Sequence, residues 1–147
     1  FLTEHFRKTG DRNNYQASLG NQANIFYARG DLDAAMALHK EEECICRELG
    51  NKDGLQRTLG NQANIFYSRG DLDSAMALHK EKERICRELR NPDGLATSLT
   101  NQSLIQIQKG KKREALALAD KAYELATRHG LSALAQQIKP ILDIIQS

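Results

Sequence analysis

The sequence predicts an all-α protein built as a solenoid, a row of antiparallel helix pairs in which each pair packs on its neighbours. The nine residues Leu-Gly-Asn-Gln-Ala-Asn-Ile-Phe-Tyr occur at 19–27 and again at 59–67, an offset of 40 residues. A decayed third copy, Leu-Thr-Asn-Gln-Ser, follows at 99–103 with the same offset. Apolar residues recur at helical spacing inside each copy. A fixed period of this length with a helical pattern is typical of stacked helical hairpins.

The 40-residue offset divides the chain into five segments. Residues 11–50, 51–90 and 91–130 are three repeats, and residues 131–147 are a C-terminal capping helix. Residues 1–10 align with the end of repeat 1, so they are expected to be the end of a preceding repeat's second helix. This gives about seven full helices plus a partial N-terminal helix. Because the first residue is Phe1 and not Met, we expect a processed product or a piece of a longer protein.

Repeat 1 predicts a helix over about 13–29 and a second helix that reaches about residue 49. In the first helix, Tyr15, Leu19, Gln22, Ala23 and Phe26 share one face. A left-handed glycine, Gly30, ends this helix, and Asp31 caps the next one. The second helix is expected to bury Leu32, Ala35, Met36, Leu38, Ile45 and Leu49.

Later repeats carry the same signals with some changes. Asn91 followed by Pro92 suits a helix cap and the first helical position, and Asn51 aligns with Asn91. Lys111 replaces the capping aspartate in repeat 3. The second helix of repeat 3 keeps an apolar stripe of Ala115, Leu116, Leu118, Ala119, Ala122, Leu125 and Ala126. Residues 131–146 form a last amphipathic segment, in which Pro140 predicts a kink or break near Lys139.

The composition excludes few classes of binding partner and requires none. The net charge is +2 and charged residues make up 27%, so nothing requires a nucleic acid or a membrane surface. No apolar run approaches the roughly 20 residues of a membrane span. The three cysteines, Cys44, Cys46 and Cys86, are an odd number and favour a reducing, cytoplasmic location over a disulfide framework.

The repeat pattern resembles the tetratricopeptide repeat. The segment from Gly30 to Ala35 looks like the turn of that family and the opening of its second helix. Leu19 then stands where the family has Trp, Ala23 where it has Gly, and Phe26 where it has Tyr. The unit is longer than the usual length of about 34 residues. This extended form is similar to the repeats of the Pins/LGN spindle-orientation adaptors, of rapsyn and of bacterial regulatory proteins.

The resemblance implies a right-handed α-solenoid whose first helices line a concave groove that holds a peptide or partner segment. Carried over to this sequence, the groove positions include small residues such as Gly20 and Gly60, which leave room for a chain. Asn24 and Asn64 match an asparagine that the Pins-type repeats use to bind peptide backbone, which suits an amide that both donates and accepts. The expected peptide-binding residues are Asn21, Asn24, Tyr27, Arg57, Asn61, Asn64, Tyr67, Asn101 and Gln108.

Structural explanations compete with each functional one. Asn21, Asn61 and Asn101 are expected to bond one another or the backbone between helices, whereas Asn24 and Asn64 suit either role. Gln22, Gln62 and Gln102 read as a structural ladder, since buried amides need partners. His39 and His79, each near glutamates, are expected to be satisfied interhelical histidines, and Cys44 with Cys46 is a weak metal motif. The basic cluster of Lys109, Lys111, Lys112 and Arg113 reads as a solvated turn.

The sequence therefore predicts a non-catalytic scaffold that binds a protein or peptide segment in the groove. No nucleophile–base pair, phosphate loop or paired carboxylates indicate an enzyme, and no cofactor or metal is expected. The alternative is a structural spacer or self-association module within a longer regulatory protein, with contact through the N-terminal edge.

Overall fold

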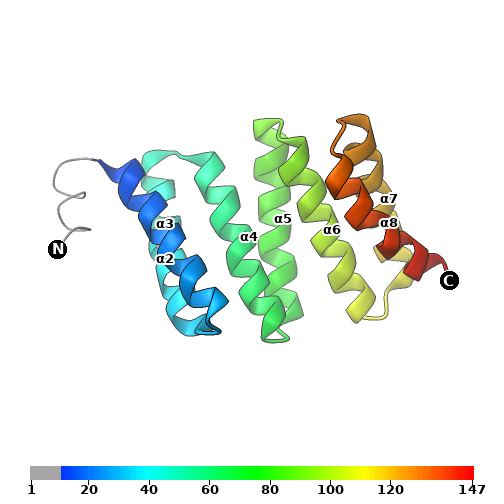
Figure 1. Cartoon of the computed structure of the whole chain (residues 1–147), viewed down its shortest axis with the longest axis horizontal. Helices are drawn as coiled ribbons and strands as arrows, with labels where there is room; N and C mark the ends of the chain where they lie inside the picture. Colours follow the sequence, from blue (N-terminus) through cyan, green and yellow to red (C-terminus); the bar gives the residue numbers. More distant parts are fainter. Residues whose placement is uncertain (1–10) are drawn as a thin grey trace.

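The computed structural model describes residues 11–147, and over that range its regular structure is entirely helical. Seven helices follow one another along a single axis, from α2 at one end to α8 at the other (Figure 1). Their bounds are α2 Arg12–Ala28, α3 Leu32–Leu49, α4 Lys52–Ser68, α5 Leu72–Leu89, α6 Pro92–Gln108, α7 Lys112–Arg128 and α8 Ser132–Gln146. The all-α solenoid is confirmed. The partial helix expected within residues 1–10 lies outside the described residues.

The helices form two layers. Each helix packs against the next one in sequence, and in addition α4 contacts α6 and α6 contacts α8. The first helices of the repeats, α2, α4 and α6, therefore lie in one layer with α8, and α3, α5 and α7 form the other. This arrangement brings equivalent positions of successive first helices next to one another.

Polar caps begin the helices as the sequence predicts. Asp31 accepts a hydrogen bond from the Ala34 amide at 3.1 Å, and Asn51 and Asn91 accept from the amides of Gly54 and Gly94 at 2.9 and 3.0 Å. Each satisfies an amide that the helix itself leaves unpaired. Lys111, which replaces the aspartate in repeat 3, makes no side-chain cap.

The core repeats at the 40-residue offset. Leu19, Leu59 and Leu99 are all buried, and so are Ala35, Ala75 and Ala115. The expectation for Leu49 is wrong, because this side chain is 39% exposed at the end of α3. Leu32, Met36 and Leu38 are only half-buried. The buried apolar face of α3 is therefore narrower than the sequence predicts, because polar side chains fill part of the space between the helices.

The helix α8 shows a second difference. Pro140 lies inside a continuous helix, so the break expected near Lys139 is absent. Both Pro140 and Gln136, whose carbonyl loses its helical donor, are exposed, and solvent can bond that carbonyl. Ile138 and Leu142 are buried on either side of the proline and hold both halves of the helix on α7.

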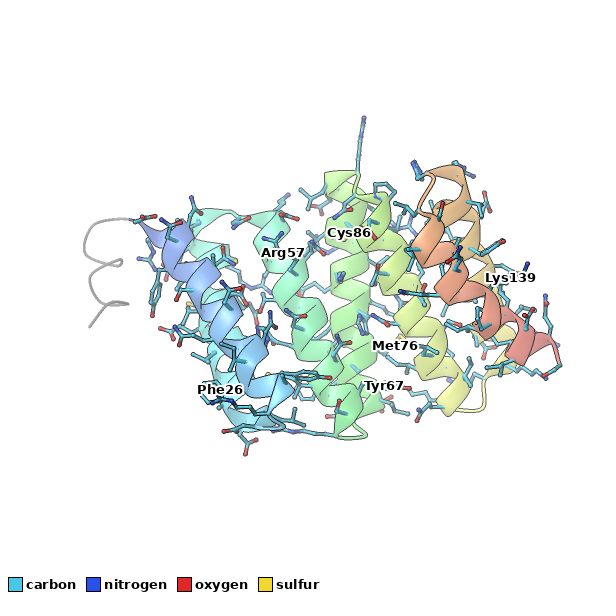
Figure 2. All side chains as sticks on the ribbon, in the orientation of Figure 1. Phe26, Arg57, Tyr67, Met76, Cys86 and Lys139 are labelled. Carbon is cyan, nitrogen blue, oxygen red and sulfur yellow. The ribbon has the colours of Figure 1, made fainter. Side chains whose placement is uncertain are left out.

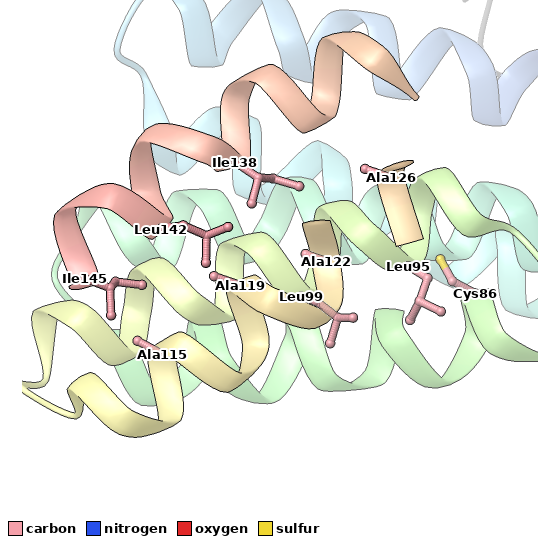
Figure 3. Close-up of a cluster of buried hydrophobic side chains, with 10 residues drawn as sticks. All are labelled: Cys86, Leu95, Leu99, Ala115, Ala119, Ala122, Ala126, Ile138, Leu142 and Ile145. Carbon is pink, nitrogen blue, oxygen red and sulfur yellow. The ribbon is translucent and has the colours of Figure 1, made fainter. Parts of the chain in front are cut away.

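The largest apolar cluster lies at this C-terminal end (Figure 3). Small side chains of α7 face large side chains of α8, and Leu95 and Leu99 of α6 complete the cluster. The α7 residues are Ala115, Ala119, Ala122 and Ala126, and the α8 residues are Ile138, Leu142 and Ile145. Alanines allow the two helices to approach closely, so that the larger side chains fill the space between them.

Candidate functional site on the first helices

Part of the expected binding face forms a hollow between α2 and α4. Asn24 and Tyr27 of α2 line it together with Asn61 and Asn64 of α4, and His39 of α3 forms its floor. Its volume is about 30 Å³. The 40-residue offset thus places side chains from two repeats around one point of the surface.

An equivalent hollow follows between α4 and α6. It is lined by Asn64, Tyr67, His79, Asn101 and Leu104, and its volume is again about 30 Å³. Asn64 lines both hollows, so the two belong to one continuous surface. Each has about the volume that one water molecule occupies in the liquid, far below the roughly 300 Å³ of a small-molecule site. We call this surface, comprising Asn24, Tyr27, Asn61, Asn64, Tyr67 and Asn101, the first-helix face.

The asparagine amides of this face are free. Within residues 11–147, the side chains of Asn24, Asn61, Asn64 and Asn101 form no hydrogen bond with another residue, and neither does that of Asn21. The structural role expected for the Asn21 series, bonding between stacked helices, is therefore not observed. Asn24 and Asn64 are also exposed. Their donors and acceptors remain available to a ligand.

The two tyrosines connect successive first helices. The Tyr27 hydroxyl lies 3.4 Å from Ser68 Oγ, and Gln108 donates to the Tyr67 hydroxyl at 2.7 Å. Figure 2 shows Tyr67 at the end of α4 and Arg57 towards its start. Gln108, expected in the groove, therefore supports Tyr67 at the edge of the face.

Besides Gln108, two more of the expected residues lie outside the hollows. Arg57 pairs with Asp53 on its own helix at 2.8 Å, and Asn21 is exposed on α2 without lining either hollow. The room expected at Gly20 and Gly60 is also taken by the protein itself. A Cβ added at Gly20 would lie 2.7 Å from Glu42 Oε2, and one at Gly60 would lie 2.9 Å from Lys82 Nζ. The two glycines accommodate side chains from the second layer.

In repeat 1 the buried group under this face is a satisfied polar cluster. His39 Nδ1 donates to Glu42 Oε1 at 3.0 Å, and Gln16 Nε2 donates to Glu42 Oε2 at 2.8 Å. Asn51 Nδ2 in turn donates to Gln16 Oε1 at 3.3 Å. The buried carboxylate is thus bonded from two sides, as a buried charge requires. The satisfied interhelical histidine expected at His39 is confirmed.

Repeat 2 carries Lys82 where repeat 1 has Glu42, and the satisfied histidine expected at His79 is not observed. His79 Nδ1 has no hydrogen-bond partner, and Lys82, only 9% exposed, makes neither a hydrogen bond nor an ion pair in the described part of the chain. Burial, aided by the neighbouring Lys82 charge, lowers the pKa of His79 to about 4. Burial also lowers the pKa of Lys82, against weaker opposing effects of Cys86 and Asp93. The sequence does contain an indication of this site, the change from Glu42 to Lys82 at equivalent buried positions, but the repeat pattern alone did not identify it.

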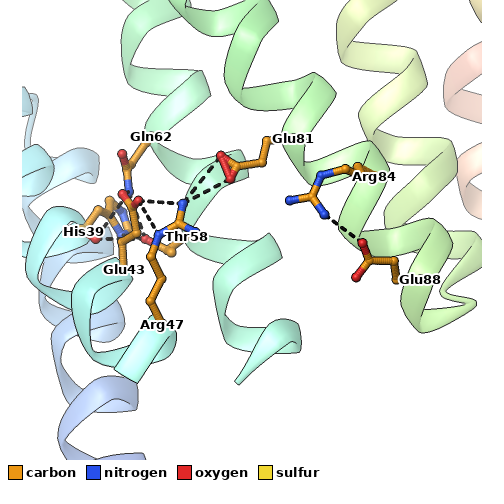
Figure 4. A network of polar contacts seen from close by, with 8 residues as sticks. All are labelled: His39, Glu43, Arg47, Thr58, Gln62, Glu81, Arg84 and Glu88. Carbon is orange, nitrogen blue, oxygen red and sulfur yellow. Dashed lines mark hydrogen bonds and ion pairs between the residues drawn. The ribbon is translucent and has the colours of Figure 1, made fainter. Parts of the chain in front are cut away.

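A second polar network links the repeats through Glu43 (Figure 4). Gln62 donates to Glu43 at 3.0 Å, and Arg47 bridges Glu43 at 2.9 Å and Glu81 at 3.1 Å. Burial would raise the pKa of Glu43, but the hydrogen bonds from Gln62 and Arg47 outweigh it and the pKa is lowered. Gln102 makes the equivalent bond to Glu83 at 2.8 Å. These glutamines are structural, as the sequence suggests.

The remaining titratable candidates are the cysteines and the basic cluster. Within residues 11–147, no group of three or more His, Cys, Asp or Glu side chains could hold a metal ion. Cys44 is exposed while Cys46 is buried, and burial raises the pKa of the Cys46 thiol to about 11. Of the basic cluster, Lys109 pairs with Asp73.

Two larger hollows lie at turns away from the first-helix face, and a third, of about 360 Å³, lies between Asp93 and Thr97 of α6 and Gln137 of α8. One of about 300 Å³ is at the α5–α6 turn, between Leu95, Leu125 and His129. The other, of about 240 Å³, lies between the α6–α7 turn and the end of α8, at Ile107, Lys112 and Ile145. Sequence reasoning indicated neither, because each depends on how a turn meets the next repeat.

Residues 54–128 match the tetratricopeptide repeat family, which covers just over half of the 147 residues. The chain belongs to this family. No curated protein sequence matches it. The repeats of this family are a non-catalytic protein-interaction fold, and membership supports a protein-interaction scaffold.

Several solved structures have the same fold at low sequence identity. The type III secretion translocator chaperone SycD of Yersinia enterocolitica is 18% identical with a TM-score of 0.71, covering 91% of this chain and 85% of SycD. BtubC from P. vanneervenii is 13% identical with a TM-score of 0.69, covering 99% and 77% of the two chains. The N-terminal domain of stress-induced protein-1 from C. elegans is 9% identical with a TM-score of 0.68, covering 87% and 97%. None of the described helices is both long and apolar enough to cross a membrane.

Proposed function

We propose that this chain is a non-catalytic module that binds an extended segment of a partner protein along its first-helix face. The free amides of Asn24, Asn61, Asn64 and Asn101 carry the proposal. An asparagine side chain offers a donor and an acceptor, which matches the donor and acceptor of each peptide unit. Because the amides recur from helix to helix, they can pair with the backbone of one extended strand at successive points.

The size and form of the surface favour a chain over a small molecule. The hollows are too small to enclose a metabolite, but they open onto a continuous face shared by α2, α4 and α6. Tyr27, which is 40% exposed, adds apolar area with a polar tip at one edge. Such a face suits shallow contacts spread along a peptide.

Selection from a library of random linear peptides, displayed on phage, would supply a probe. The affinity of a selected peptide is then measured by fluorescence anisotropy. Changing both Asn24→Ala and Asn64→Ala removes two exposed, unpaired amides, so we expect binding to weaken about tenfold or more while the melting temperature changes little. Lys40→Ala and Lys80→Ala, exposed at equivalent positions of α3 and α5, are the matched controls. Failure to select any peptide, or equal binding by the asparagine variant, would contradict the proposal.

The alternative, a spacer or self-association module, is favoured by one observation at the end of the stack. Ile25 is 52% exposed, whereas its equivalents Ile65 and Ile105 are fully buried by a neighbouring repeat. The N-terminal edge expected from residues 1–10 lies outside the described residues. Sedimentation velocity at several concentrations tests this alternative: self-association that Ile25→Lys abolishes would support it, and a monomer at all concentrations would oppose it.

A further inference from the structure

Within the most similar stretch of repeats 1 and 2, residues 19–50 and 59–90, the two repeats differ at one buried position. Residues 19–50 and 59–90 differ at five places, of which four are exposed or half-buried. The exception is Glu42 against Lys82, both buried. The four other pairs are Ala28/Ser68, Ala34/Ser74, Cys44/Arg84 and Gly50/Arg90. The charge reversal between Glu42 and Lys82 therefore lies in the interior of the protein and not on its surface.

The two buried charges differ in whether the protein satisfies them. Glu42 accepts hydrogen bonds from His39 and Gln16, at 3.0 and 2.8 Å. Lys82 has no hydrogen-bond or ion-pair partner among the described residues, although Asp93 attracts it from a greater distance, and the adjacent His79 Nδ1 has no hydrogen-bond partner. A cation of this kind is expensive to bury without an anion. The cluster in repeat 2 is thus short of one negative group.

The Lys82 ammonium can reach a ligand on the first-helix face. Its side chain lies against Gly60, where an added Cβ would be 2.9 Å from Nζ and 3.2 Å from Cδ. Lys82 follows His79 by about one turn of α5, and His79 lines the hollow between α4 and α6. Lys82 is only 9% exposed, yet its Nζ is not among the fully occluded atoms without a partner, so it retains a solvent contact. The ammonium therefore lies beside Gly60 of α4, one helical turn from the residue beneath the α4–α6 hollow.

We propose that Lys82 pairs with the carboxylate side chain of an acidic residue in the bound segment, and thereby fixes which repeat that segment occupies. This inference rests on the proposed function. Repeats 1 and 2 present the same asparagines, and the second hollow differs from the first only in having Leu104 in the place of Asn64, so a peptide could bind in two registers one repeat apart. An acidic residue breaks this equivalence, because it meets a cation without a partner at Gly60 but the carboxylate of Glu42 at Gly20. Discrimination then comes from attraction at one site and repulsion at the other.

The chain offers a variant that inverts the charge without disturbing the fold. Lys82→Glu recreates in repeat 2 the cluster seen in repeat 1, with His79 and Gln56 in the places of His39 and Gln16. Arg90→Gly is the matched control. It lowers the net charge by one, where Lys82→Glu lowers it by two, and it also installs the repeat 1 residue, but at an exposed position away from the face. Thermal melts of both variants check that they fold.

The experiment repeats the phage selection with the parent chain and with both variants. We expect peptides selected on the parent chain to share an acidic residue at a fixed position. Changing that residue from Glu to Gln is expected to weaken binding to the parent about tenfold and to have no such effect on Lys82→Glu, the coupling expected of a desolvated charge pair. Arg90→Gly should bind the original peptides as the parent does.

The outcomes separate the two proposals. Selected peptides that depend on Asn24 and Asn64 but show no acidic position, or that bind Lys82→Glu unchanged, contradict the role of Lys82 and leave the proposed function in place. An equal loss in Arg90→Gly and Lys82→Glu points to overall charge and also contradicts it. Failure to select any peptide contradicts both.

Discussion

Equivalent positions in the first two junctions and in the last junction carry opposite chemistry on the same backbone. Thr58 and Ser98 donate to the carbonyl oxygens of His39 and His79 at 3.1 and 2.6 Å. At the third equivalent position stands Ile138, fully buried in the apolar cluster of Figure 3. Likewise, Leu142 stands at the position equivalent to Gln62 and Gln102. Ala119 stands at the position equivalent to His39 and His79.

This difference shows that helix pairs of one geometry can be joined in two ways. The apolar junction of α7 and α8 is stabilised by burial, which depends little on the identity of single partners. The polar junctions depend on complete pairing, so a change of one residue leaves a buried group unsatisfied. Repeat 2 already contains such unsatisfied buried groups, Lys82 and His79. Polar junctions therefore suit positions where a ligand completes the set, and the apolar junction suits the end of the stack.

The largest effect is expected at the apolar junction. Ile138→Ala removes a fully buried side chain between α8 and α7 and leaves a cavity, which should lower the free energy of unfolding by about 4 kcal/mol. Urea denaturation measures this change. Ile144→Ala, at a residue of the same helix that is 65% exposed, is the control and should cost less than about 0.5 kcal/mol. Similar losses in both variants would mean that α8 does not pack as described.

The unsatisfied His79 predicts that the stability of the protein depends on pH. The pKa of His79 is about 4 in the folded chain, against an ordinary value of 6.5, because burial and Lys82 disfavour its charged form. Between these values the unfolded chain binds a proton that the folded chain does not. Stability from this group is therefore complete above pH 6.5 and is lost as the pH falls towards 4, by on the order of 3 kcal/mol.

Urea denaturation at several pH values would measure this dependence. His79→Ala, the residue found at the equivalent Ala119, should flatten the slope of stability against pH between 4 and 6.5. Carboxylates that titrate in the same range are present in both proteins and cancel in the comparison. An unchanged slope would show that folding does not lower the pKa of His79.

The satisfied and unsatisfied clusters should respond in opposite directions to loss of their charge. Glu42→Ala leaves His39 and Gln16 buried without their acceptor, so we expect the free energy of unfolding to fall by about 2 kcal/mol. Lys82→Met removes a buried ammonium without a partner and keeps much of its volume, so stability should rise. Chemical denaturation at neutral pH checks both, and a loss in the two variants alike would contradict the difference between the repeats.

Local signals in the sequence were enough for the helices but not for the junctions. The caps at Asp31, Asn51 and Asn91 depend on the next three residues, and all three are confirmed. Pro140 misled because its effect depends on whether the carbonyl of Gln136 meets solvent, which only the packed helix decides. The exposure of Leu49, at the end of α3, likewise depends on how the helices pack and not on the local sequence.

The same distinction between local sequence signals and packing between helices applies to the first-helix face. The family pattern identified the positions of Asn24, Asn61 and Asn64, and the structure brings them together. That their amides are free, and that Lys82 lacks an anion, are facts about distances between helices. A comparison of residues 19–50 with 59–90 could have indicated Lys82, since it is the one buried difference between those two stretches.

The smallest effect is expected where first helices touch at the exposed edge. Tyr67→Phe removes the hydroxyl that accepts from Gln108 at 2.7 Å, whereas Tyr27→Phe removes a weaker contact of 3.4 Å with Ser68. Because water can replace either bond, the first change should cost about 0.5 kcal/mol and the second close to nothing. Urea denaturation of the two variants in parallel makes the comparison. A cost for Tyr67→Phe as large as that of Glu42→Ala would mean that the polar edge of the face, and not only the buried clusters beneath it, holds successive repeats together.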